Sequence, residues 1–119
     1  MDQATVSNIL RTLQTKIIDG QKQLTAVRAQ MQAQERERRR NELTLKEIES
    51  LPDDVATYKS VGKMFLQVDQ TVVVKDLKKS IEQSIDTSKG LEKKQKYVER
   101  ELSDCSTSLR DIMHHGRDR

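Results

Sequence analysis

The chain has 119 residues, of which 34% are hydrophobic and 3% aromatic, and it has no tryptophan, so a broad globular core is not expected. Another 34% are charged, with 22 basic and 19 acidic side chains, and this near balance indicates long solvated helices instead of disorder. The net charge of +3 is too small to indicate a nucleic-acid-binding protein by itself.

Localisation signals are weak in this sequence. No apolar run approaches the roughly 18 residues of a membrane span, and the start MDQATVSNIL lacks the basic flank and apolar stretch of a signal peptide. We therefore expect a cytoplasmic protein with no membrane partner. The single cysteine, Cys105, cannot form an internal disulfide and is interpreted as a small buried apolar residue.

The first predicted helix covers residues 1–43, where apolar side chains recur at alternating steps of four and three. Ile9 and Ile18 lie beside this stripe and are expected to widen it. Gly20 in the helix interior costs about 1 kcal/mol relative to alanine. It would allow a close approach of the facing helix or a slight bend, but simple tolerance is the favoured interpretation. We call the stripe the first seam; it consists of Val6, Leu10, Leu13, Ile17, Gly20, Leu24, Val27 and Met31.

After Met31 the apolar pattern fades into the basic run QERERRRNE. Its arginines alternate with glutamates and have no neighbouring aromatic residue, so a solvated helix end is favoured over a phosphate-binding site. Thr44 and Glu47 have the spacing of a capping box. Residues 44–52 are therefore predicted to form a separate short helix and a turn that Pro52 ends.

Residues 55–68 are predicted to form a β-hairpin, because apolar and polar residues alternate around a Gly-Lys pair that suits a type II′ turn. The turn pairs Val61 with Met64 and places Thr57 opposite Val68. Bulky apolar groups then occupy both faces, and an isolated hairpin is marginal in water. We expect the hairpin to meet strands of other chains through Tyr58, Val61, Gly62, Met64, Phe65, Leu66 and Val68.

The second predicted helix covers residues 70–115, after Asp69 as N-cap, and residues 116–119 are expected to form a tail. Three polar seam positions make its middle the least tightly held part, and Ile85 and Tyr97 are expected to compensate beside them. Joined by the hairpin, the two helices are predicted to form a long antiparallel coiled coil within a single, mostly α domain. The second seam consists of Val74, Leu77, Ile81, Ser84, Ser88, Leu91, Gln95, Val98, Leu102, Cys105, Leu109 and Ile112.

Signals of catalysis are missing from the sequence, which has no glycine-rich phosphate loop, nucleophile elbow or metal-ligand spacing. The two histidines, His114 and His115, are adjacent and point apart on a helix, so they cannot chelate one ion. We therefore expect a protein that is not an enzyme and binds no cofactor or metal.

The predicted order of a long helix, a single hairpin and a second long helix within 119 residues resembles that of a β-type subunit of the prefoldin family. The likeness is strongest at YKSVGKMFL (residues 58–66) and at LEKKQKYVERELSD (residues 91–104). In that family two α-type and four β-type subunits join their strands into intersubunit β-barrels, from which six coiled coils project. The resemblance thus implies that this hairpin completes such a barrel with two α-type and three further β-type prefoldin subunits. Gly20 and Gly90 are not the residues expected in the helices of this family. Whether the helices are straight at these two positions is therefore left open.

The resemblance also implies an activity: ATP-independent capture of unfolded polypeptides such as actin and tubulin, and their delivery to the cytosolic group II chaperonin. Clients would bind at the coiled-coil tip. Ile9 and Met113 lie off the seam and are the better candidates for client contact, whereas mutual packing is favoured for Leu10, Leu13 and Leu109. The implied tip residues are Val6, Ile9, Leu10, Leu13, Leu102, Leu109, Ile112 and Met113.

Two alternatives stay open at this stage. The chain could be a structural coiled-coil adaptor in a multisubunit complex, with no client role. A basic-zipper DNA binder would use residues 36–40, but it needs one uninterrupted helix beyond them, and Pro52 breaks that continuity. The favoured interpretation has no nucleic-acid partner.

Overall fold

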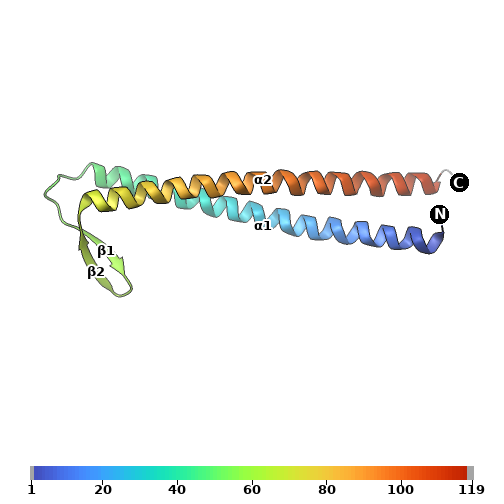
Figure 1. Ribbon diagram of the computed structural model, residues 1–119, viewed down its shortest axis with the longest axis horizontal. Coiled ribbons are helices and arrows are strands. Elements are labelled where there is room, and N and C mark those ends of the chain that lie inside the picture. Colours follow the sequence, from blue (N-terminus) through green and yellow to red (C-terminus); the bar gives the residue numbers. More distant parts are fainter. Residues whose placement is uncertain (1, 118–119) are drawn as a thin grey trace. The chain divides into compact units, whose positions relative to one another are not determined.

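The computed structural model describes residues 2–117 and contains two long helices and one hairpin. Helix α1 is Gln3–Glu49, strand β1 is Thr57–Val61, strand β2 is Met64–Val68 and helix α2 is Gln70–Arg117. Figure 1 shows this order by colour, from blue α1 through the green and yellow hairpin to red α2. The chain forms two compact units, one made of residues 1–31 and 90–119 and the other of residues 32–89.

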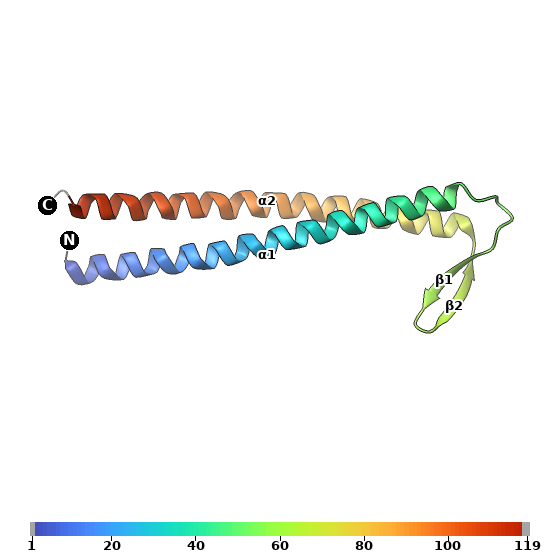
Figure 2. The ribbon, with the colours of Figure 1, turned by 180° about the vertical axis from the view of Figure 1, so that it is seen from behind.

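In the first unit, the start of α1 runs beside the end of α2 in the antiparallel direction, and both views show the two helix ends together (Figures 1 and 2). The predicted seam positions in this unit are all buried or half-buried, with Val27 and Val98 each 2% exposed. A salt bridge of 3.6 Å joins Arg28 to Glu99 at the edge of the pair, and its exposure makes it worth little stability. The heptad prediction is therefore confirmed here.

At Gly20 the favoured interpretation of simple tolerance is wrong, and the alternative of a close approach by the facing helix is correct. A Cβ atom built on Gly20 would lie 2.7 Å from Leu102 Cδ2 and 3.0 Å from Leu102 Cγ, closer than side chains normally pack. The glycine thus makes room for the leucine of the facing helix and is more than tolerated. A Cβ atom on Gly90, in contrast, would have no heavy atom within 4 Å.

In the second unit, α1 continues without a break through residue 44 to Glu49, so the separate short helix predicted for residues 44–52 is wrong. The reason is local, because the Thr44 hydroxyl donates a hydrogen bond of 2.8 Å to the Arg40 carbonyl inside the helix. A threonine can make this bond to the preceding turn or cap a new helix, and here it does the former.

The first seam does not end at Met31 as expected. Half-buried positions continue at the same spacing through the polar residues Gln34, Arg38 and Asn41 before apolar residues return. On α2 the polar seam residue Ser84 is only 5% exposed, so this part of the seam is packed by small and polar side chains. Ile85 is exposed and does not compensate, and neither does Tyr97, which is exposed in the first unit. Ile18 of the first unit is also exposed and does not widen the seam.

The ends of α2 lie close to the predicted ones. Asp69 precedes the helix, and its carbonyl accepts the Val73 amide at 3.2 Å. At the other end α2 continues to Arg117, so the tail predicted for residues 116–119 begins at least two residues too early, and residues 118 and 119 lie outside the described residues.

Candidate interaction surfaces

The hairpin has the register that the sequence predicts. Its Cα partners are Thr57 with Val68, Tyr58 with Gln67, Lys59 with Leu66, Ser60 with Phe65 and Val61 with Met64. Figure 2 shows the two strands side by side within their unit. Gly62 has a φ of +61° and is the only described residue with positive φ, the pattern of a type II′ turn, which requires it at the first central position alone. The predicted turn type is confirmed.

Two side-chain hydrogen bonds fix the base of the hairpin. The Thr57 hydroxyl donates to the Val68 carbonyl across the two strands. Beside it, the Gln70 side-chain amide donates to the Pro52 carbonyl at 3.0 Å, which ties the loop before β1 to the first residue of α2. The strand pair is therefore held at its open end by side chains of the flanking segments.

Both faces of the hairpin present apolar side chains without a cover. Alternation places Val61, Met64, Leu66 and Val68 on one face and Tyr58 and Phe65 on the other. Phe65 is 72% exposed, Met64 63% and Tyr58 61%, whereas Val68 at the base is half-buried. Both outer strand edges are also unpaired within the sheet, which contains only β1 and β2 among the described residues. Such edges and faces are typical of surfaces that pair with other strands.

The residues expected at the tip lie in the first unit, on both of its helices. Val6, Ile9, Leu10 and Leu13 on α1 are half-buried, as are Leu102, Leu109 and Ile112 on α2. Ile9 is therefore half-buried, as its seam neighbours are. Met113 is 55% exposed and lines a shallow hollow together with Ser106, Leu109, Arg110 and His114.

Comparison with known proteins decides the family. The sequence profile described as "Prefoldin subunit" matches residues 11–115. The chain belongs to the prefoldin family.

The relatives are similar over most of their length. A Schizosaccharomyces pombe protein named "Probable prefoldin subunit 1" is 34% identical over 107 residues, which cover 90% of this chain and 96% of that one. "Prefoldin subunit 1" of Arabidopsis thaliana is 29% identical, covering 94% of this chain and 87% of its own. Subunit 1 is also the prefoldin subunit that residues 58–66 and 91–104 resemble.

A solved structure supports the fold directly. The prefoldin β subunit of Thermococcus strain KS-1 matches with a TM-score of 0.78 and 28% identity, over 86% of this chain and 90% of that one. The predicted fold of two long helices around a single hairpin is thus confirmed as that of a prefoldin β subunit.

Three of the four arginines in the basic run of this prefoldin chain pair with glutamates of α1. Arg38 donates to Glu35 and, at 2.9 Å, to Glu42, while Arg39 pairs with Glu35 at 3.1 Å and Arg40 with Glu37 at 2.7 Å. The hydrogen bond from Arg38 holds the pKa of the Glu35 carboxyl below its ordinary 4.5, and Arg39 adds to this effect. Because α1 continues to Glu49, the run lies inside a continuous helix, and the prediction that it forms a solvated helix end is wrong.

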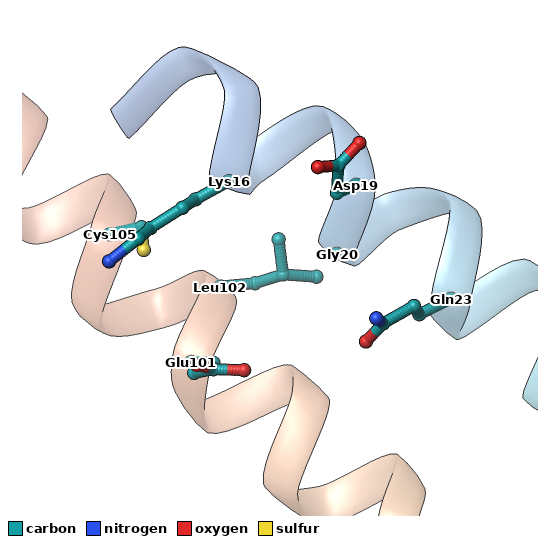
Figure 3. A pocket seen from close by; sticks show the side chains of 7 residues that line it. All are labelled: Lys16, Asp19, Gly20, Gln23, Glu101, Leu102 and Cys105. Atoms are coloured by element: carbon teal, nitrogen blue, oxygen red, sulfur yellow. The ribbon is translucent and has the colours of Figure 1, made fainter. Parts of the chain in front are cut away.

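A second hollow of the first unit surrounds the Gly20 contact. Figure 3 shows the Leu102 side chain pointing toward Gly20, with Lys16, Asp19 and Gln23 on one helix and Glu101 and Cys105 on the other. Cys105 is half-buried, which fits its predicted seam position. The hollow is shallow and carries mixed charge, so we interpret it as part of the helix packing.

Within residues 2–117 no helix is both long and apolar enough to cross a lipid bilayer. No group of three or more potential metal ligands comes together in the same part of the chain. The sequence analysis did not identify Leu43 as an exposed apolar residue, although it is 65% exposed on α1. Its position opposite the seam is the signal that could have identified it.

Proposed function

We propose that this chain is a β-type subunit of a heterohexameric, ATP-independent co-chaperone. In this assembly the hairpin joins strands of neighbouring prefoldin subunits, two of α type and three further ones of β type. The function requires no chemical step, and we place it in the cytoplasm.

The observation that carries the assembly proposal is the hairpin with its two uncovered apolar faces. Phe65, Met64 and Tyr58 are each more than half exposed, and the strand edges have no partner among the described residues. Removing a fully exposed phenylalanine or methionine side chain from water is favourable by roughly 1.5 to 3 kcal/mol, so covering these faces favours assembly. The family match and the naming of its relatives as subunits support the same conclusion.

We further propose that unfolded polypeptides of the actin and tubulin class bind at the tip and pass from there to the cytosolic group II chaperonin. Met113 and the hollow beside Leu109 support this role, because a flexible, exposed methionine adapts to many apolar partners. The half-buried residues Val6, Ile9, Leu10, Leu13, Leu102 and Ile112 would contribute when the helix ends fray.

The client role is tested with the chain assembled with its partner subunits and with denatured actin diluted into the mixture. Light scattering is expected to show that wild type suppresses actin aggregation and that deletion of residues 1–12 weakens this suppression. Met113→Asp should weaken it as well, whereas Tyr97→Asp, a change at an exposed residue away from the tip, should not. Full holding activity of the deletion variant in an intact assembly would contradict the tip proposal.

A further inference from the structure

Leu43 is an exposed apolar residue at a position of α1 that does not contribute to the helix seam. It is 65% exposed in the interior of α1, more than any other aliphatic residue that the structure records as exposed. The half-buried seam positions around it are Asn41, Thr44 and Leu45. Leu43 lies two residues from Asn41, so it points to the opposite side of the helix from the seam.

Cations surround Leu43 on this outer side of α1. Arg39 and Arg40 lie one turn before it and Lys46 one turn after it, so their side chains share its face. Arg36 lies one turn further back on the same stripe. All four are exposed, and we call Arg36, Arg39, Arg40, Leu43 and Lys46 the Leu43 patch.

Most of this positive charge is available to a partner. Arg39 and Arg40 are held only by pairs to glutamates of their own helix, with both arginines 72% exposed, and such surface pairs are weak. Arg36 forms none of the ion pairs found between residues 2 and 117. Glu47 is the one carboxylate on the stripe itself, one turn beyond Leu43.

We propose that the Leu43 patch is a docking surface for an acidic amphipathic helix of a partner protein. The partner would place an apolar side chain against Leu43 and its carboxylates against the surrounding cations. Each of four successive turns carries at least one residue of the patch, which suits a helix laid alongside α1. Neither the hairpin nor the tip residues belong to the patch, so this surface is independent of the proposed assembly and client sites.

A polypeptide fits this surface better than a nucleic acid does. Arginine and lysine would contact phosphates, but an exposed leucine at the centre adds nothing to phosphate binding. The patch also contains no aromatic side chain on which a base could stack. An apolar contact ringed by cations is instead an arrangement that recognises a helix with one apolar stripe and acidic flanks.

The test uses the full chain in its assembly with partner subunits and a fluorescein-labelled probe of about 18 residues, five helical turns. The probe carries a leucine stripe and glutamates on its other faces, and a scrambled peptide of the same composition is the comparison. Fluorescence anisotropy is expected to show tighter binding of the amphipathic probe. Leu43→Ser should weaken it about tenfold, and the triple variant R36Q/R39Q/R40Q should weaken it and flatten its salt dependence.

Matched controls separate this surface from general effects. The triple variant K93Q/K94Q/K96Q removes the same charge from α2, and Tyr97→Ser removes another exposed side chain, so both should leave binding unchanged. Because the tip could also bind a peptide with an apolar stripe, the difference between wild type and Leu43→Ser is the decisive readout. Equal binding of the scrambled peptide, an unaffected Leu43→Ser variant or tighter binding of single-stranded DNA would each overturn the proposal. Failure of Leu43→Ser to assemble would also overturn it, because a neighbouring subunit would then cover the patch.

Discussion

Replacing each of the two helix glycines by alanine should change stability in different ways. Alanine is favoured over glycine in a helix interior by about 1 kcal/mol. At Gly90 a new Cβ atom meets no heavy atom within 4 Å, so Gly90→Ala should raise the free energy of unfolding by nearly that amount. In a chain of this length the melting temperature should rise by about 4 °C.

At Gly20 the same gain is offset, because the new Cβ atom would lie 2.7 Å from Leu102 Cδ2. Displacing a packed side chain typically costs about 1 to 3 kcal/mol. Gly20→Ala should therefore be neutral or destabilising by up to about 2 kcal/mol, even though Leu102 can move its side-chain end. In a Leu102→Ala background the obstacle is gone, and Gly20→Ala should then stabilise as Gly90→Ala does.

Urea and thermal unfolding followed by circular dichroism would measure all four variants. The expected coupling between Gly20→Ala and Leu102→Ala is about 1 to 3 kcal/mol, the size found for residues in direct contact. Equal stabilisation by Gly20→Ala and Gly90→Ala would refute the close packing of Leu102 over Gly20. Absence of coupling in the double variant would refute it independently.

Two further predictions concern polar contacts of the second unit. The pKa of Glu35 is lowered in the folded chain, so its stabilising effect is present at neutral pH and is lost as the pH falls through that lowered value. Glu35→Gln should therefore lower the melting temperature at pH 7 and have less effect in acid, and an equal effect at both pH values would contradict this. Gln70→Ala removes the hydrogen bond to the Pro52 carbonyl and should speed amide exchange in residues 50–56, while Gln67→Ala, on the exposed hairpin, should not.

Much of the fold could be predicted because its signals are periodic or local. The spacing of three and four residues between apolar side chains located the seam positions of the first unit. A glycine at the first position of a two-residue turn set the hairpin register. Thr44 was misinterpreted because the same side chain can cap a new helix or bond to the preceding turn of an existing one. Which of these occurs depends on whether the half-buried stripe continues, and here it continues through polar residues.

The side chain of the facing helix that each seam position meets could not be predicted. The close approach of Leu102 to Gly20 depends on how the two helices face each other, which the spacing of a single helix does not contain. Of the two candidate surfaces, the hairpin could be predicted from the sequence more fully than the tip. Exposure of both hairpin faces follows from alternation alone, whereas the half-burial of Ile9 and the exposure of Met113 depend on where the facing helix begins and ends.

Native mass spectrometry of the tagged chain purified with its partners tests whether the hairpin joins this chain to other prefoldin subunits. Phe65 is 72% exposed, and Phe65→Asp would replace apolar contact with a charge that is costly to bury. Wild type is expected to give the mass of a heterohexamer, and Phe65→Asp the mass of the chain alone, while Lys63→Asp at the turn should still assemble. A wild-type chain that purifies alone, or a Phe65→Asp variant that retains the full heterohexamer, would show that the hairpin does not join the subunits.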